Sequence, residues 1–194
     1  MKKMILGLFL AACWCTDSVK AQDVAVKTNL LYDASATFNA GVEVALGQKW
    51  TIDLSGNYNP WTFSDNRKWK HWLVQPELRY WLCRKMGGHF FGFHLHGGQY
   101  NAGNIDTGLK LPGTDLSPLR QYRYEGWFAG AGAAYGYAWM LGKHWNLEAE
   151  IGVGYAYSRY DKFQCANCGS KLEQGKGHHY VGPTKAALNL VYVF

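Results

Sequence analysis

The chain has 194 residues, with 20 Lys and Arg against 14 Asp and Glu, and a formal net charge of +6 at pH 7. This mild basic excess, with no basic stripe interleaved with aromatic residues, argues against a nucleic-acid-binding protein. The 23 glycines and 16% aromatic residues favour β structure, and no apolar run of 18 residues follows the N-terminal segment to form a transmembrane helix.

The first 21 residues are predicted to form a secretory signal peptide. Two lysines make a charged start, and the apolar run 4–15 is too short to span a bilayer. Cleavage would remove three lysines and one aspartate, which lowers the net charge from +6 to +4. Residues 22–194 would then form one domain. The alternative is a lipoprotein signal in which Cys13 is the lipidated residue.

After residue 22, apolar and polar side chains alternate in eight runs, which is the period of a β-strand. Short turns alternate with longer polar connections, as in barrels with short periplasmic turns and longer external loops. We therefore predict an all-β fold, an eight-stranded antiparallel up-and-down transmembrane β-barrel. The predicted strands are approximately residues 24–33, 37–47, 50–59, 71–83, 89–100, 122–141, 145–158 and 185–194. The predicted longer connections are 60–70, 101–121 and 159–179.

Two stretches fit these strands poorly. Pro76 falls in the middle of the fourth strand, where it cannot donate a hydrogen bond to the ladder, so we expect a bulge there. Residues 126–136 of the sixth strand are so rich in Gly and Ala that their pattern does not show which side chains face inward.

Tryptophans near the short turns are expected to form the lower aromatic girdle of the barrel, because tryptophan prefers the level of the lipid head groups. The alternative is a set of core aromatics in a soluble β-sandwich. The residues expected at this depth are Trp50, Trp81, Trp139 and Trp145.

Charged side chains fall on the strand faces opposite the large apolar residues. An eight-stranded barrel is only wide enough for side chains to fill it, so charges inside must pair. We predict a closed polar interior in which an arginine neutralises glutamates, with a gate or proton path as the alternative. The predicted network comprises Glu43, Glu77, Arg79, Glu148 and Glu150, with Lys27, Asp53 and Lys185 also facing inward.

Candidate catalytic and metal-binding residues form no specific motif. His94 and His96 share one face of the fifth strand, where histidines more often hydrogen-bond in a polar interior than bind a metal. Ser64, Asp65 and His71 could supply a nucleophile and a base for a lipid-modifying enzyme of the outer leaflet. We expect no cofactor and no metal site.

Two cysteines lie close together in the last predicted external loop. An oxidising cell surface favours a disulfide between Cys165 and Cys168. His178 and His179 follow in the same predicted loop, so a zinc site is the alternative.

The chain ends on an apolar strand and an aromatic residue. A closed membrane barrel leaves no strand edge exposed, and its apolar face meets lipid. The ending is also similar to the C-terminal signal read by the outer-membrane assembly machinery, with Leu190, Tyr192 and Phe194 as the signal residues. The alternative is the last strand of a soluble sandwich.

Three segments, 27–33, 75–81 and 136–139, resemble a family of small Bacteroidota outer-membrane barrels of unknown function. The resemblance covers nearly all of the mature chain and implies the location and architecture, but it offers no catalytic residues to carry over. In that family Pro76 occupies an ordinary motif position. The resemblance also implies genes that lie near fimbrial genes, and with them a link to surface-fibre assembly.

The sequence therefore predicts an outer-membrane barrel with a structural or interaction role at the cell surface. A fimbrial-assembly accessory protein and an outer-leaflet lipid-modifying enzyme are the alternatives. The expected partners are outer-membrane lipid and the barrel assembly machinery, with surface-fibre components as a further class and nucleic acid excluded.

Overall fold

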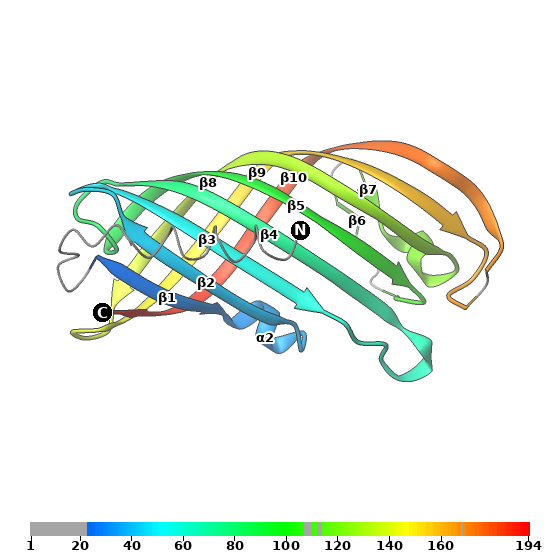
Figure 1. The fold of residues 1–194 in the computed structure, drawn as a ribbon, viewed down its shortest axis with the longest axis horizontal. Coiled ribbons are helices and arrows are strands. Elements are labelled where there is room, and N and C mark those ends of the chain that lie inside the picture. Colours follow the sequence, from blue (N-terminus) through cyan, green and yellow to red (C-terminus); the bar gives the residue numbers. More distant parts are fainter. Residues whose placement is uncertain (1–22, 107–109, 112–113, 168) are drawn as a thin grey trace, which may run out of the picture.

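The computed structural model describes residues 23–106, 110–111, 114–167 and 169–194 (Figure 1). The predicted signal peptide (1–21), with Cys13, lies outside the described residues, and so does Cys168. Within the described part of the chain, no helix is long and apolar enough to cross a membrane.

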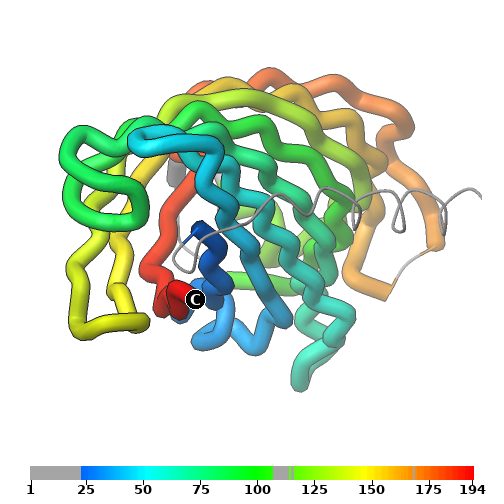
Figure 2. Tube along the Cα trace, turned by 60° about the vertical axis from the view of Figure 1, so that its left-hand side comes forward, coloured from blue at the N-terminus to red at the C-terminus, as the bar shows by residue number. Residues whose placement is uncertain are grey.

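Eight antiparallel strands of the described chain form one sheet that closes into a ring, as the sequence predicts. Within the ring, each strand pairs with the ring strand that follows it in the sequence. The first strand (blue) pairs with the last (red) and so closes the ring (Figure 2). The strands are β1 (Val24–Asn29), β2 (Phe38–Ala45), β3 (Trp50–Asn59), β4 (Lys68–Trp81), β5 (Gly88–Gly103), β8 (Arg123–Met140), β9 (Trp145–Phe163) and β10 (Lys171–Val193).

The two ends of the ring differ in their connections. The short-turn end carries residues 46–49, 82–87 and 141–144, together with the C-terminus (Figure 1). The long-connection end carries residues 30–37 and 60–67 and the described parts of 104–122 and 164–170. The remaining elements all lie in these longer connections: α2 (Leu30–Ala34), η1 (Ser64–Asn66), the hairpin of β6 (Lys110–Leu111) and β7 (Thr114–Asp115), and η2 (Ser117–Arg120).

The first strand is shorter than predicted, because its last residues form α2. Asn29 caps this helix, with its side-chain oxygen accepting a hydrogen bond from the backbone nitrogen of Leu31 at 3.1 Å. The same oxygen accepts from the backbone nitrogen of Leu188 at 3.2 Å, which ties the cap to β10. The predicted strand over 24–33 is therefore wrong beyond residue 29.

The predicted loop over 159–179 is wrong, because most of it is paired strand. β9 and β10 stay paired to the ends of both strands, with Arg159 opposite Gly177 and Phe163 opposite Lys171. β8 pairs with β9 over the same stretch, up to Arg123 opposite Phe163. Two register shifts interrupt this pairing between residues 171 and 176. The alternation of apolar and polar residues is weak here, so the pattern alone does not reveal the strands.

The ring has an apolar outer face and a charged interior. Phe93, Ile151 and Val153 are 58%, 62% and 60% exposed on the outside. Arg79 and Glu77 are buried inside. This distribution is the reverse of that in a soluble domain, where large apolar side chains are gathered in the core.

The inner face of β8 carries small residues because large side chains from β5 occupy the space beside it. A Cβ atom at Gly132 would lie 2.6 Å from Nε2 of His94, and one at Gly136 would lie 2.3 Å from the ring of Phe90. The glycines thus leave room for these rings. Trp127 and Tyr135 lie on the outer face, which settles the orientation of this strand.

The expected bulge at Pro76 is wrong. β4 pairs with β5 at Val74–Gly97 and again at Glu77–His94, so equal numbers of residues lie between these pairs on both strands. The pairing with β5 is interrupted at residues 75–76, while Pro76 stays in register with β3. The strand accommodates the missing N–H by losing ladder pairs on one side.

Trp81 was expected in the outer girdle, and this expectation is wrong. It is fully buried inside the ring, where it packs on Phe90 at 4.6 Å between ring centroids and donates a hydrogen bond to Oγ1 of Thr51. Met86 folds inward from the turn after β4, and apolar residues therefore close the interior at the short-turn end. The other three tryptophans of this set are exposed on the outer face: Trp50, Trp139 and Trp145.

Candidate functional site

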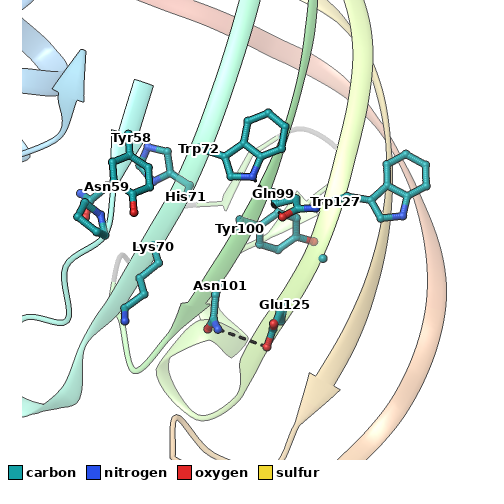
Figure 3. Close-up of a pocket in the computed structure, with 12 residues that line it drawn as sticks. Tyr58, Asn59, Lys70, His71, Trp72, Gln99, Tyr100, Asn101, Glu125 and Trp127 are labelled. Carbon is teal, nitrogen blue, oxygen red and sulfur yellow. Dashed lines mark hydrogen bonds between the residues drawn. The ribbon is translucent and has the colours of Figure 1, made fainter. Parts of the chain in front are cut away.

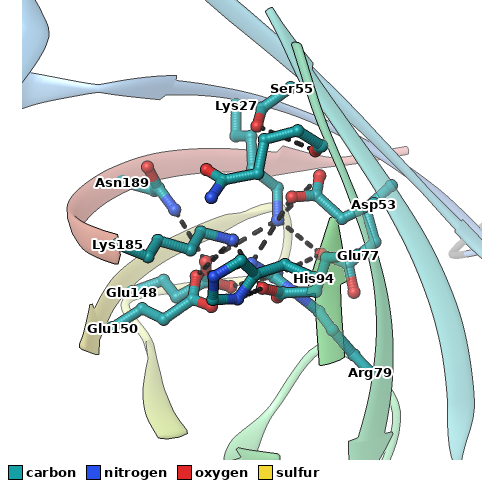
Figure 4. Close-up of polar contacts among 12 residues, drawn as sticks. Lys27, Asp53, Ser55, Glu77, Arg79, His94, Glu148, Glu150, Lys185 and Asn189 are labelled. Atoms are coloured by element: carbon teal, nitrogen blue, oxygen red, sulfur yellow. Dashed lines mark hydrogen bonds and ion pairs between the residues drawn. The ribbon is translucent and has the colours of Figure 1, made fainter. Parts of the chain in front are cut away.

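Arg79 lies at the centre of the interior, and all five residues of the predicted network meet there. Figure 4 shows Arg79 beside Glu77, Glu148 and Glu150. Its Nε donates to Glu77 at 2.6 Å, and its Nη2 donates to Glu150 at 2.8 Å. Its Nη1 donates to Glu43 at 2.8 Å and to Glu148 at 3.0 Å. One guanidinium group thus binds glutamates from two other strands, β2 and β9, as well as from its own strand, β4.

Two lysines complete this interior ion network. Nζ of Lys27 lies 2.5 Å from Glu43, and Nζ of Lys185 lies 2.8 Å from Glu77. Asp53 lies 3.5 Å from Lys27. The described network therefore contains five carboxylates and three basic side chains, and every carboxylate forms at least one ion pair.

Strand register explains why the network needs a central cation. Glu43 lies opposite Asp53, and Asp53 lies opposite Glu77, so three carboxylates stand in a row across β2, β3 and β4. Like charges directly opposite each other on neighbouring strands repel. Arg79 and Lys27 reach across this row, which turns a repulsive arrangement into a paired one.

An interior cavity of about 570 Å³ lies between the ion network and the long-connection end. Lys27, Asp53 and Lys185 line its side next to the network, and Tyr32 and Trp69 line it near α2 and the long-connection end. The walls between them are rich in side-chain amides and hydroxyls: Asn29, Ser35, Asn39, Ser55, Asn57, Gln75, Thr184 and Asn189. The alternation of side chains along each strand does not reveal this cavity, although amides recur on the inward face of several strands.

A second hollow, the outer-wall groove, lies on the outside near the long-connection end and has a volume of about 490 Å³ (Figure 3). Trp72 and Trp127 line it, and Nε1 of Trp72 donates to the side-chain oxygen of Gln99 at 3.2 Å. Asn101 donates to Glu125 beside them. The groove therefore combines aromatic and polar groups on the outer surface of the ring.

The histidines of β5 lie inside the ring. Nε2 of His94 is 2.9 Å from Oγ1 of Thr184, and its ring lies 5.6 Å from that of His96. His178 and His179 fall within β10 and contact different partners, Thr114 and Tyr155. Among the described residues, no group of three or more His, Cys, Asp or Glu side chains could hold a metal ion.

The candidate catalytic residues are placed near the long-connection end. Ser64 and Asp65 lie in η1, and His71 lies on β4. Nδ1 of His71 is 3.1 Å from the backbone oxygen of Trp69. No hydrogen bond found among the described residues joins Ser64, Asp65 and His71, so the structure does not bring them together as a nucleophile and base.

Cys165 lies in the turn after β9 and is disulfide-bonded. Cys168 is outside the described residues, so a disulfide between these two cysteines stays a prediction. Cys83, near the short turn after β4, is an exposed free thiol.

The aromatic C-terminus packs on the outer face of the ring. The ring of Tyr192 lies 5.0 Å from that of Trp145 and 5.1 Å from that of Phe194. Leu190 pairs with Leu147 of β9. These contacts place the three residues, while their role as an assembly signal stays a prediction.

The fold and the site define a class of protein: a ring-closed all-β chain with an apolar outer face and a paired, charged interior. The chain belongs to the family described as Protein of unknown function (DUF3575), whose profile matches residues 7–194. Comparison with curated proteins and with solved structures gives no match. The resemblance to a family of unknown function is thus confirmed, while the outer-membrane location and the Bacteroidota source stay predictions.

Proposed function

We propose that this protein is an outer-membrane β-barrel with a closed polar interior and a structural or interaction role at the cell surface. The observation that carries the proposal is the reversed distribution of side chains, apolar outside and charged inside. Lipid solvates such an outer face, whereas in water it would be a large exposed apolar surface. A closed ring also satisfies the strand edges, as a bilayer requires.

Tryptophans near both ends of the ring support this placement. Trp50 and Trp145 are exposed beside the short turns, and Trp72 and Trp127 are exposed toward the long-connection end. Tryptophan at two levels is typical of a barrel that meets head groups at both interfaces. The apolar residues between these levels would face the acyl chains.

The orientation follows the usual asymmetry of outer-membrane barrels. In this proposal the short-turn end faces the periplasm, and the long-connection end, with the extended β9–β10 hairpin, faces the exterior. Lipid and the assembly machinery are the partners that this placement requires, and the external hairpin is the surface available to others. No described contact favours fibre assembly or lipid modification, so both stay predictions from the sequence.

Membrane fractionation followed by gel mobility tests the proposal. We expect the protein in the outer-membrane fraction, with a mobility in mild detergent that changes on boiling, because closed barrels resist unfolding by detergent. A periplasmic protein of the same host, run beside it, should show no such shift. Recovery of the protein in the soluble periplasm without a heat-dependent shift would rule the proposal out.

A further inference from the structure

We infer that the interior cavity binds a saccharide, which enters from the long-connection end. The inference requires the closed ring and its cavity but not the membrane location, so it goes beyond the proposed function. Its support comes from an unpaired buried donor, from the charge next to the cavity, from the size of the cavity and from the aromatic side chains that line it.

Two buried polar atoms that line the cavity have no hydrogen-bond partner among the described residues. They are Nε2 of Gln75 and Oδ1 of Asp53, on residues that are 5% and 1% exposed. The amide nitrogen of Gln75 is a donor with no partner, and leaving such a buried group unpaired is unfavourable. Oδ1 of Asp53 is an acceptor that has only its ion pair with Nζ of Lys27, at 3.5 Å. A sugar hydroxyl can satisfy either atom, because it both donates and accepts hydrogen bonds.

The other polar groups of the wall are largely occupied. Asn189 donates to Glu148 at 2.7 Å, and Asn39 donates to Asp33 at 2.7 Å. Oγ of Ser55 donates to the backbone oxygen of Gln75 at 3.3 Å. The wall is therefore held in place by its own hydrogen bonds, and the unpaired donor of Gln75 is set in a fixed frame. Such preorganisation lowers the cost of binding.

Charge favours a neutral ligand. The ion network beside the cavity has five carboxylates against three basic side chains, so an added anion would meet a net negative surrounding. Both lysines next to the cavity already bind carboxylates, Lys27 to Glu43 and Lys185 to Glu77. A neutral polyhydroxylated molecule offers hydrogen bonds without adding charge.

Size and shape favour a molecule over an ion. The volume of about 570 Å³ falls within the usual range of ligand pockets, roughly 300–1,000 Å³. At the long-connection end, the rings of Tyr32 and Trp69 lie 6.3 and 5.9 Å from the ring of His71. Apolar ring faces of this kind can pack against the C–H face of a sugar, while its hydroxyls reach the wall.

Titration calorimetry of the purified full-length protein in detergent tests the inference. The probes are glucose, galactose, mannose, fucose and N-acetylglucosamine, with inorganic phosphate and spermidine as charged comparisons. We expect saturable binding of at least one sugar, and Gln75→Leu should weaken it about fivefold to tenfold, the usual worth of one hydrogen bond. Gln99→Leu, the same change in the outer-wall groove, should leave sugar affinity unchanged.

Folding is checked separately by heat-dependent gel mobility. Because Nε2 of Gln75 has no partner in the described fold, Gln75→Leu should keep the wild-type shift. If it does not, Gln75→Met takes its place as an unbranched variant that also lacks the donor. Absence of sugar binding, equal binding by the variant that folds, or binding of phosphate or spermidine in place of sugar would each overturn the inference. None of these outcomes depends on where the protein lies in the cell.

Discussion

At the scale of residues, the interior depends on one arginine. The guanidinium of Arg79 is fully buried, donates to four glutamates and lies 4.6 Å from the ring of Phe90. A lysine could not replace it, because an ammonium group lacks the planar fork that serves several carboxylates at once. Its bonds also span the ring, so the residue links strands that do not pair with each other.

Arg79→Ala should therefore lower the free energy of unfolding by about 3–5 kcal/mol, because it leaves buried carboxylates without their central partner. Denaturant unfolding in lipid vesicles, followed by tryptophan fluorescence, measures this change. Arg159→Ala is the matched control, since Arg159 is exposed and its Nε donates to the backbone oxygen of Gly175, and it should change stability by less than about 0.5 kcal/mol. Equal effects of the two substitutions would contradict a central role for Arg79.

At the scale of elements, the feature that the sequence predicts best is the alternation of inward and outward side chains along each strand. It separates the inward Glu77 and Arg79 from the outward Leu78 because successive strand residues point to opposite faces. It does not reveal register, so the row of Glu43, Asp53 and Glu77 becomes visible only in the paired strands. The cavity was missed for the same reason, since its wall joins residues of strands far apart in the chain.

The ends of the strands were least predictable, because local hydrogen bonds compete with the ladder there. Asn29 starts a helix where the alternation still favours a strand. By contrast, β9 and β10 are longer than predicted, because they extend through a polar segment that lacks the apolar alternation of a membrane strand. In this hairpin the carboxylate of Asp161 accepts from Nζ of Lys171 and from the backbone nitrogen of Gly175, both at 2.7 Å.

These hydrogen bonds, first that from Lys171, lower the pKa of Asp161 below its ordinary value. Because the pKa is lowered in the folded hairpin, the contribution to stability is present above about pH 4 and is lost as the pH falls through the lowered pKa. NMR titration of the Asp161 carboxyl carbon should show a midpoint below about 3.9. Lys171→Ala should raise this midpoint, while Lys176→Ala, which removes a partner of Glu173 instead, should not. An ordinary midpoint in the unsubstituted protein would show that the hairpin contacts do not form.

At the scale of the whole molecule, the ring is filled in layers along its axis. Apolar residues, among them Met86 and Trp81, close the short-turn end. The ion network around Arg79 comes next, and the interior cavity follows toward the long-connection end. The cavity is therefore a blind pocket with access from one end, and a ring of eight strands leaves no room for a channel beside these layers.

We therefore expect negligible steady conductance when the purified protein is inserted into planar lipid bilayers. A general porin in the same bilayer serves as the positive control for insertion and recording. Met86→Ala should leave the conductance negligible, because the ion network blocks the interior independently of the apolar layer beneath it. Arg79→Ala combined with Met86→Ala removes side-chain atoms from both layers and should give the first measurable current.

A large steady conductance in the unsubstituted protein would contradict the closed interior. Conductance from Met86→Ala alone would show that the apolar layer, and not the network, is the barrier.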